Sequence, residues 1–369
     1  MSDTLSRLLD LAVEIQQIPA PTFHEAQRAA FVRARFEAEG LRPLQSDPLG
    51  NIYACLKGSR RAARPLVISA HLDTVFPLSV ALTIERQAER LAGPGIGDNA
   101  LGVAGLFGLV WELRRRRLRL PGDLWLVANV CEEGLGDLRG MRAVVERFGE
   151  RPLAYLVLEG MALGQIYHRG LGVRRYRIAV RTAGGHSWID YGSPSAIHEL
   201  TALAARITAL QPPTRPRTTL NVGVIAGGTS VNTIAAEAAL ELDLRSEAPE
   251  ALAGLAKQVE GLCAAARRPG VTVEVEPIGA RPAGEIPASH PLVRLAQATL
   301  QNLGLEARLN IGSTDANLPL SRGLPAIAIG LTNGGGAHTV HEYIHLPPLE
   351  KGLEQLLHLV EKVWDIQRD

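Results

Sequence analysis

The sequence predicts an α/β fold, in which a mixed sheet is covered by helices on both faces and interrupted by an inserted α+β domain. Two observations lead to this prediction. Short apolar β-rich segments alternate with helical segments over the first 160 residues, as they do in covered α/β sheets. From residue 173 to residue 279 the segments become long alternating strands of the antiparallel type. We therefore expect a main domain made of residues 1–172 and 280–369, with residues 173–279 inserted into it.

The main domain begins with two predicted helices. Residues 4–18 have apolar side chains at helical spacing, and residues 22–40 follow with Thr22 and Glu25 in the positions of a capping box. Apolar β-rich segments then predict four strands, at residues 50–58, 65–73, 123–133 and 153–160. Helical segments separate the later strands, at residues 99–117 and 138–148. In a sheet of this kind, sites gather at the carboxyl ends of the strands.

The inserted domain has the predicted order β, α, β, β, α, β. Its strands are expected at residues 172–187, 218–228, 237–246 and 271–279, and its helices at residues 194–210 and 250–268. The α/β pattern then returns with a helix at 290–305, a mixed segment at 313–330 and a final helix near 348–366. Short links with glycine and proline, at residues 168–173 and 277–285, join the domains and could serve as hinges.

Composition narrows the classes of function. Lys and Arg total 39 against 38 for Asp and Glu, a net charge of +1, so no strong field favours nucleic acid or an anionic membrane. The cysteines, Cys55, Cys131 and Cys263, are far apart and odd in number, which favours a reducing cytoplasm. We find neither a signal peptide nor an uninterrupted apolar run of about 18 residues. We expect a cytoplasmic protein, neither secreted nor membrane-spanning, that acts on a small molecule.

Ionisable side chains stand where predicted strands end. The strand at residues 123–133 ends in Glu132 and Glu133, and Gly134 and Gly136 then supply a turn. An apolar strand has no structural use for two carboxylates, because a desolvated charge costs several kcal/mol unless it is paired. Similar residues follow other strands or lie in glycine-rich loops, namely His71, Asp73, Asp98, Glu159 and His338.

Together these residues suit a site for two zinc ions. Asp73, two residues after His71, suits a carboxylate that holds the second N–H of that imidazole. The others give two imidazoles and four carboxylates, which is what two ions that share a bridging carboxylate, plus one free base, would use. Each residue taken alone has an ordinary alternative: a satisfied histidine, a helix cap for Asp98, or an exposed loop pair for Glu132 and Glu133. Repetition at successive strand ends favours the metal site, although the spacing does not assign each acid to an ion.

Seven motifs in order give the sequence a resemblance to a known family. The chain contains HLDTV, GDNALG, CEEG, LEG, GGHS, GSTDAN and HTVHEY. In their order and spacing they resemble the co-catalytic zinc peptidase and deacylase family, which includes peptidase T, glutamate carboxypeptidase, acetylornithine deacetylase, succinyl-diaminopimelate desuccinylase and aminoacylase. The resemblance covers essentially the whole chain. It implies a zinc-exopeptidase-like catalytic domain with a ferredoxin-like insertion that acts as a lid and dimerisation domain.

The resemblance also assigns roles around two Zn²⁺ ions, with Co²⁺ or Mn²⁺ as alternatives. It implies that Asp98 bridges the two ions and that the other ligands divide into two pairs: His71 with Glu159, and Glu133 with His338. Glu132 becomes the general base, which takes a proton from the metal-bridging water and returns it to the leaving amine. Asp73 orients His71.

In the inserted domain, His186 matches a histidine that reaches the partner's active site in dimeric relatives and polarises the substrate carbonyl. Its ordinary alternative is a cap of the helix that follows a turn. Asn232 and Arg245 match positions that bind the substrate carboxylate, although Ala235 replaces the family's usual proline. The resemblance implies that a loop lines the substrate pocket, made of Gly312, Ser313 and Thr314, while Asp315 has an ordinary alternative as a cap of the next helix.

We therefore expect a homodimeric two-zinc hydrolase of amide bonds in small peptides. Ala100 and Glu159 depart from the tripeptidase branch, which has lysine and aspartate there, and glutamate at the second position is typical of deacylases and carboxypeptidases. The alternatives are an N-acyl-amino-acid deacylase and, in another class, a catalytically silent metal-binding regulatory protein. Glu132 discriminates between these classes, because mere metal binding would not need it.

Overall fold

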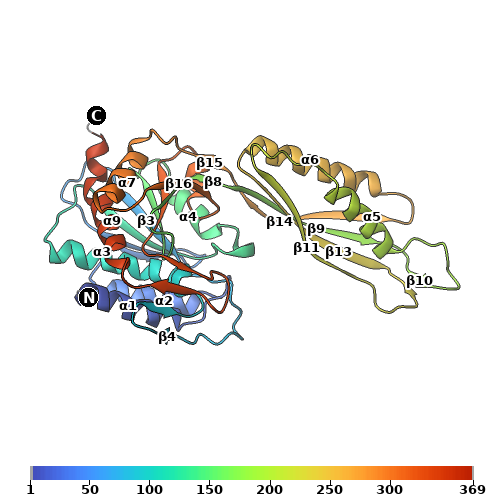
Figure 1. Cartoon of the computed structure of the whole chain (residues 1–369), viewed down its shortest axis with the longest axis horizontal. Coiled ribbons are helices and arrows are strands. Elements are labelled where there is room, and N and C mark those ends of the chain that lie inside the picture. Colours follow the sequence, from blue (N-terminus) through green and yellow to red (C-terminus); the bar gives the residue numbers. More distant parts are fainter. Residues whose placement is uncertain (1–2, 368–369) are drawn as a thin grey trace. The chain divides into compact units, whose positions relative to one another are not determined.

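A computed structural model describes residues 3–367 of the chain and divides it into two compact units. Unit 1 contains the residues up to Gly170 and from Gly284 onward, and unit 2 is Leu171–Ala283. The elements of both units are labelled in Figure 1. Strand β8 extends to Gly170 and strand β14 to Arg281, so most of the predicted links belong to strands. In residues 3–367, no helix is both long and apolar enough to cross a membrane.

Unit 1 is built on a nine-stranded mixed sheet, which confirms the predicted fold class. The strand order is β1-β2-β6-β3-β7-β17-β8-β15, and β16 pairs with β8. The central strand β3 runs parallel to both β6 and β7. The strands are β1 Leu44–Ser46, β2 Ile52–Leu56, β3 Leu66–His71, β6 Leu124–Asn129, β7 Tyr155–Glu159, β8 Gln165–Gly170, β15 Gly284–Glu285, β16 Arg308–Gly312 and β17 Ala326–Gly330.

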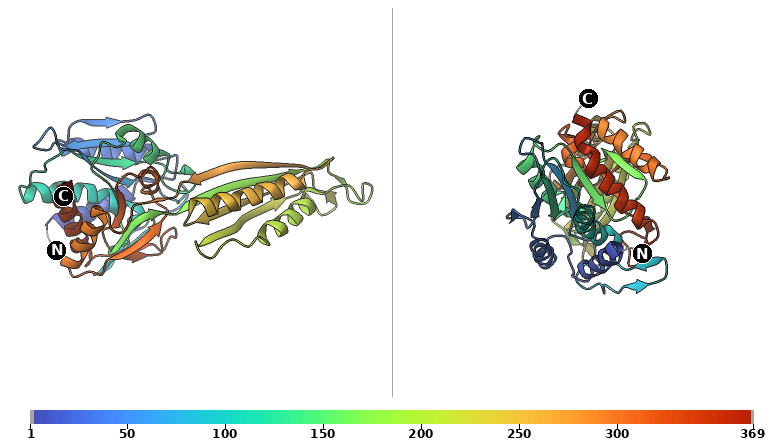
Figure 2. Two further views of the ribbon diagram at one scale, coloured as in Figure 1. Left: turned by 90° about the horizontal axis from the view of Figure 1, so that it is seen from above. Right: turned by 90° about the vertical axis from the view of Figure 1, so that its left-hand side faces the viewer.

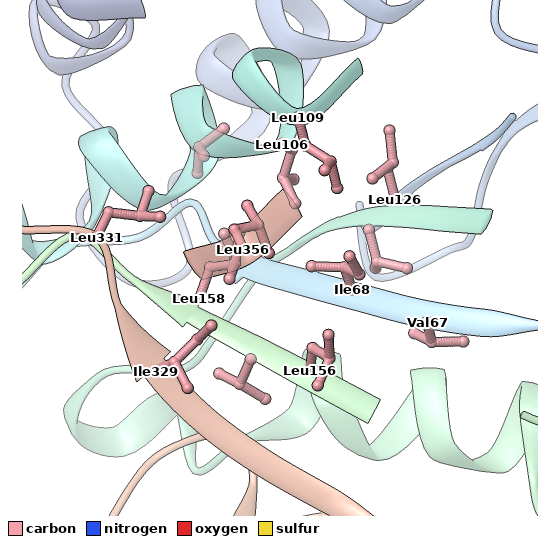
Figure 3. Close-up of a cluster of buried hydrophobic side chains, with 14 of the residues drawn as sticks. Val67, Ile68, Leu106, Leu109, Leu126, Leu156, Leu158, Ile329, Leu331 and Leu356 are labelled. Atoms are coloured by element: carbon pink, nitrogen blue, oxygen red, sulfur yellow. The ribbon is translucent and has the colours of Figure 1, made fainter. Parts of the chain in front are cut away.

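Helices pack on this sheet and exclude water from its central strands. They are α1 Asp3–Gln16, α2 Ala26–Ala38, α3 Leu101–Arg115, α4 Arg139–Phe148, α7 Pro291–Asn302, α8 Asn317–Ser321 and α9 Leu349–Lys362. Figure 3 shows Leu106 and Leu109 of α3 above the sheet, close to Ile68, Leu126 and Leu158. All six residues of β3 are buried, as expected for a parallel strand with both faces covered. The apolar core thus holds the strand ends in place.

A second, smaller sheet in unit 1 was not predicted from the sequence. It has four strands in the order β18-β19-β5-β4. The strands have only two or three residues, too few for a period-two pattern to show. They are β4 Glu85–Arg86, β5 Arg90–Ala92, β18 Gly334–Gly335 and β19 Tyr343–His345, and three short helical turns lie elsewhere in the unit, η1 Ile96–Ala100, η2 Gly134–Gly136 and η3 Val363–Gln367.

The predicted capping box at Thr22 and Glu25 is wrong. Helix α2 begins at Ala26, and Glu25 stands before it without a side-chain capping bond. The Thr22 hydroxyl instead donates to Oδ2 of Asp73 at 2.9 Å. Both side chains thus bind other parts of the chain, and the motif spacing alone did not reveal this.

Unit 2 has the predicted β, α, β, β, α, β order with a core of its own. Its four long strands form an antiparallel sheet in the order β11-β13-β9-β14. Helices α5 and α6 pack against each other and on the same face of this sheet (Figure 2). The elements are β9 Gly172–Arg181, β10 Gly185–His186, α5 Ala196–Thr208, β11 Thr218–Gly227, β12 Thr233–Ile234, β13 Glu237–Ser246, α6 Pro249–Ala266 and β14 Thr272–Arg281.

A buried acid near the C-terminal end of α3 should make stability depend on pH. The hydrogen bond from Arg115 lowers the pKa of Glu112 from 4.5 to about 2, so ionised Glu112 stabilises the fold above pH 4.5 and less as pH falls toward 2. Glu112→Gln should lower the free energy of unfolding by about 1–2 kcal/mol at pH 7. Urea unfolding should show this difference shrinking below pH 4.5. The exposed Glu350→Gln should change it by less than about 0.5 kcal/mol, and a pH-independent loss at Glu112 would contradict this account.

Candidate metal centre

The candidate site lies at the carboxyl ends of the parallel strands in unit 1. β3 ends at His71, β7 ends at Glu159, and β6 leads into the turn with Glu132–Glu133. Because β3 is parallel to both β6 and β7, these ends share one edge of the sheet. Asp98 in η1 and His338 in the segment between β18 and β19 reach the same place through loops.

Asp98 lies between the two histidines. Its Oδ1 is 3.1 Å from Nε2 of His71, and its Oδ2 is 3.2 Å from Nε2 of His338. Glu159 Oε2 lies 3.7 Å from the His71 nitrogen, and Glu133 Oε1 lies 3.2 Å from the His338 nitrogen. The structure therefore brings together all five residues predicted as metal ligands, with Asp98 in contact with both histidines.

The neighbouring carboxylates change the proton affinity of both histidines. Burial lowers the pKa of His71, but hydrogen bonds to three carboxylates outweigh burial and raise it well above the usual value. Hydrogen bonds with Asp98 and Glu133 raise the pKa of His338 to about 10. Burial, with help from nearby negative charges, raises the pKa of Glu159. A cluster with this excess of acid is a favourable place for a cation.

The donor atoms fit a pair of divalent metal ions. His71 Nδ1 donates to the backbone oxygen of Asp73 at 3.1 Å, so Nε2 is the nitrogen that faces Asp98 and that could bind an ion in place of its proton. We had expected this contact at the Asp73 carboxylate, whose Oδ1 lies 3.6 Å from Nδ1. Imidazole nitrogen and carboxylate oxygen are ligands of zinc, and also of divalent cobalt and manganese. Ligand atoms of His71, Asp98 and Glu133 lie within 4.8 Å of one another, close enough for one ion.

The carboxylate of Asp73 holds the turn that carries the two adjacent glutamates. Its Oδ1 accepts the backbone N–H of Glu132, and its Oδ2 accepts that of Glu133, both at 2.9 Å. The chain is already left-handed at Cys131, with φ of 58°, before Gly134 with φ of 51°. The turn that we expected from the glycines therefore begins earlier. Both glutamates are only 5% exposed, which excludes an exposed loop pair.

Sequence analysis missed Glu342, a fully buried residue that shapes the Asp98 loop. Its carboxylate accepts three backbone N–H groups, from Gly95 at 3.1 Å, Gly97 at 2.7 Å and Asp98 at 2.8 Å. Burial raises the pKa of Glu342 to about 7. In the sequence, Glu342 stands out only as an acid four residues after His338 in the motif HTVHEY. That position alone does not predict which groups its carboxylate binds. Glu342 connects the loop of Asp98 to that of His338.

Asp315 is buried beside the end of β6, and the alternative that it caps the next helix is wrong. Its Oδ2 accepts the side-chain amide of Asn129 at 2.7 Å, and burial raises its pKa to about 7. The preceding loop, Gly312–Thr314, follows β16, and the Thr314 hydroxyl accepts the N–H of Ala316 at 3.2 Å. The loop predicted to line the substrate pocket is therefore anchored to the same sheet as the acids and histidines.

Unit 2 does not bring all of its predicted residues together. His186 and Asn232 are neighbours at the β10–β12 ribbon, where Ser187 donates its N–H to the Asn232 carbonyl at 3.1 Å. Arg245 lies near the far end of β13, roughly 25 Å from the start of that strand, and binds Asp243 at 2.7 Å. One carboxylate group cannot contact both Asn232 and Arg245 of the same chain.

Comparisons with known proteins point to one family. The sequence model described as "Peptidase family M20/M25/M40" matches residues 67–362. The uncharacterized protein YqjE of Bacillus subtilis is 24% identical over 96% of this chain and 98% of its own. Among solved structures, a tripeptidase from Staphylococcus aureus has a TM-score of 0.83 at 22% identity, covering 98% of this chain and 99% of that one. YXEP of B. subtilis, described as a dinuclear metal binding peptidase, has a TM-score of 0.69 at 18% identity, covering 98% and 99%. At these low sequence identities, the structural similarities show that the chain shares the fold of these proteins.

Proposed function

The chain belongs to peptidase family M20/M25/M40, and we propose that it is a two-zinc hydrolase that cleaves amide bonds of small peptides. The observation that carries this proposal is the placement of Asp98, whose two oxygens face two different histidines at 3.1 and 3.2 Å. A residue that only capped a helix or closed a turn would not need both oxygens toward imidazoles. The description of one structural neighbour as a dinuclear metal binding peptidase supports the same assignment.

In this proposal the described residues of unit 1 hold the ions. Asp98 bridges them, His71 and Glu159 complete one site, and Glu133 and His338 complete the other. Zinc, when bound, lowers the pKa of a coordinated water and polarises the substrate carbonyl; cobalt or manganese are the alternatives. His71 is ready for this role, because its Nδ1 donates to a backbone oxygen and leaves Nε2 as the ligand atom.

Glu132 is the proposed general base. Its backbone N–H is bound to Asp73 at 2.9 Å, next to the ligand Glu133, so the carboxylate starts from a fixed position in the turn. In the reaction it takes a proton from the attacking water and delivers that proton to the leaving amine nitrogen. A protein that only bound metal for a regulatory purpose would have no need of this residue, which makes that alternative the weaker one.

His186 is proposed as the donor that stabilises the developing negative charge on the carbonyl oxygen. Its Nδ1 accepts the backbone N–H groups of Trp188 at 3.2 Å and Ile189 at 3.4 Å. The neutral ring therefore carries its proton on Nε2, which is the form that an oxyanion donor requires. The ring caps a local turn and not a helix, since the next helix begins only at Ala196, and this capping fixes the tautomer.

We propose that His186 acts on the site of a partner subunit in a homodimer formed through unit 2. Asn232, its neighbour on the β10–β12 ribbon, is the proposed contact for the substrate carboxylate, with the loop Gly312–Thr314 lining the pocket. Arg245, near the other end of β13, remains a proposed contact for the substrate carboxylate, and in the homodimer it comes from a different chain than Asn232. The three free cysteines are buried, which suits the reducing cytoplasm proposed as its location.

The alternative substrate class is N-acyl amino acids, which the same mechanism would cleave. Glu159 supports this alternative, because glutamate at that position is typical of deacylases and carboxypeptidases in the family that the sequence resembles. A panel of dipeptides, tripeptides, and N-acetyl and N-succinyl amino acids, offered to the zinc-loaded protein, separates the two classes. Hydrolysis of the acyl compounds alone would replace the peptidase proposal with the deacylase.

The two adjacent glutamates should differ sharply when each is changed. Glu132→Gln should keep its metal and lower kcat on the order of a thousandfold, because an amide cannot accept the proton of water. Glu133→Gln should lose metal first, since it removes a ligand charge. Metal content after dialysis and kcat on the best substrate of the panel measure both effects. An active Glu132→Gln variant would show that the roles are assigned wrongly.

The proposal for His186 predicts complementation between inactive subunits. His186→Ala should lower kcat by roughly a hundredfold, the effect of removing one oxyanion donor, without changing metal content. Mixing His186→Ala with Glu132→Gln should restore part of the activity, because one site of each heterodimer then has both residues. Sedimentation shows whether the protein is a dimer, and two different affinity tags on the variants, purified in sequence, verify subunit exchange. A fully active monomer, or mixed subunits that exchange and remain inactive, would contradict action on a partner's site.

A further inference from the structure

The segment before α2, together with the first turn of that helix, contains three polar residues whose side chains do not cap the helix. Thr22, Glu25 and Arg28 are spaced three residues apart. Glu25 is 5% exposed and Arg28 only 1%, whereas the intervening Phe23 is 51% exposed. Burying an acid and a guanidinium is costly unless both are bound by specific partners. Their partners lie at the ends of β3 and β6, next to the proposed catalytic residues.

Two buried carboxylates accept three consecutive backbone N–H groups of the turn at residues 131–133. Oε1 of Glu25 accepts the N–H of Cys131 at 3.1 Å. The carboxylate of Asp73 accepts the N–H groups of Glu132 and Glu133, both at 2.9 Å. The Thr22 hydroxyl donates to Oδ2 of Asp73 at 2.9 Å. N–H groups beyond the end of a strand have no ladder partner, so these bonds determine the path of the turn.

The methyl group of Thr22 has a separate contact from its hydroxyl. Thr22 donates its N–H to the oxygen of Thr74 at 3.3 Å, so the segment runs beside the chain that leaves Asp73. A Cβ placed on Gly136 would lie 2.7 Å from the Thr22 methyl carbon, too close for any side chain at Gly136. The hydroxyl therefore binds the acid while the methyl packs against the turn, and the two contacts can be removed one at a time.

Arg28 supplies a positive charge behind the acids. Burial lowers the pKa of Arg28 to about 10, against the opposing effect of Asp73 and Glu25, so the guanidinium stays charged at neutral pH. It donates to three backbone oxygens, at 2.7, 2.9 and 3.3 Å, those of Leu72, Ile18 and Gln16. Leu72 precedes Asp73 directly, and this bond ties the N-terminal segment to the end of β3.

On the basis of the proposed function, we propose that Thr22, Glu25 and Arg28 are positioning residues for Glu132 and Glu133. They hold the backbone of the turn and the Asp73 carboxylate, and through these they set where the proposed base and its neighbouring ligand point. Loss of these hydrogen bonds should leave Glu132 and Glu133 in the chain but change the orientation of their side chains. Changes to groups that orient ligands in metal sites typically reduce metal affinity or activity by about 10- to 100-fold.

A matched pair of variants at Thr22 tests the hydroxyl against the methyl. Thr22→Val keeps the methyl and removes the donor to Asp73, whereas Thr22→Ser keeps the donor and removes the methyl. We expect Thr22→Val to lower Zn²⁺ affinity or kcat about tenfold with KM little changed, and Thr22→Ser to stay within about twofold of the wild type. Zn²⁺ affinity is measured by competition with a chromophoric chelator, independently of turnover. The opposite order would show that Thr22 acts by packing alone and would overturn the proposal.

A second pair at Glu25 separates positioning from simple stability. Glu25→Gln keeps an oxygen that can accept the N–H of Cys131, so its Zn²⁺ affinity and kcat should stay within about threefold of the wild type. Glu25→Leu has no such oxygen and should lose about tenfold or more in Zn²⁺ affinity or kcat. Glu112→Leu is the control, since Glu112 is buried to the same degree, 4% exposed, on the far part of α3. It should lower the melting temperature without changing Zn²⁺ affinity. If Glu25→Leu behaves like Glu112→Leu, Glu25 is not a positioning residue.

The Zn²⁺ measurement also separates failure of this inference from failure of the proposed function. If the wild type binds zinc but cleaves no amide, the proposed function fails, and the order of Zn²⁺ affinities among the Thr22 variants still decides the positioning role. If Glu132→Gln is inactive as expected while Thr22→Val matches the wild type in both Zn²⁺ affinity and kcat, only the positioning role is wrong.

Discussion

The site of this protein depends on one carboxylate held between two imidazoles. Asp98 faces His71 with one oxygen and His338 with the other, so it joins a residue at a strand end to one from a distant loop. The loop that carries Asp98 is fixed by Glu342, which binds three of its backbone N–H groups. Buried acids in such number are costly, and the arrangement becomes favourable when cations neutralise them.

Much of this arrangement could be predicted from the sequence because it follows from the parallel sheet. Apolar segments that end in His71, Glu159 or the Glu132–Glu133 pair predict buried strands, and parallel strands bring their carboxyl ends to one edge. The resemblance to a peptidase and deacylase family then supplied the roles, and the match to peptidase family M20/M25/M40 over residues 67–362 confirms the family.

What the sequence did not reveal are contacts that join segments far apart in the chain. Glu342 lies more than two hundred residues from the loop that it binds, and no local pattern predicts such a pair. Thr22 and Glu25 have the spacing of a capping box, yet Asp73 and the N–H of Cys131 compete successfully for their side chains. Tertiary partners, in each case, override the local signal.

Calorimetric titration of the metal-free protein with Zn²⁺ tests the central claim most directly, with Asp98→Ala beside the wild type. The account predicts two equivalents bound per wild-type chain, and loss of both in Asp98→Ala, because the two groups of ligands share that carboxylate. A single equivalent in the wild type, or one site that keeps full affinity in Asp98→Ala, would contradict a centre built around Asp98.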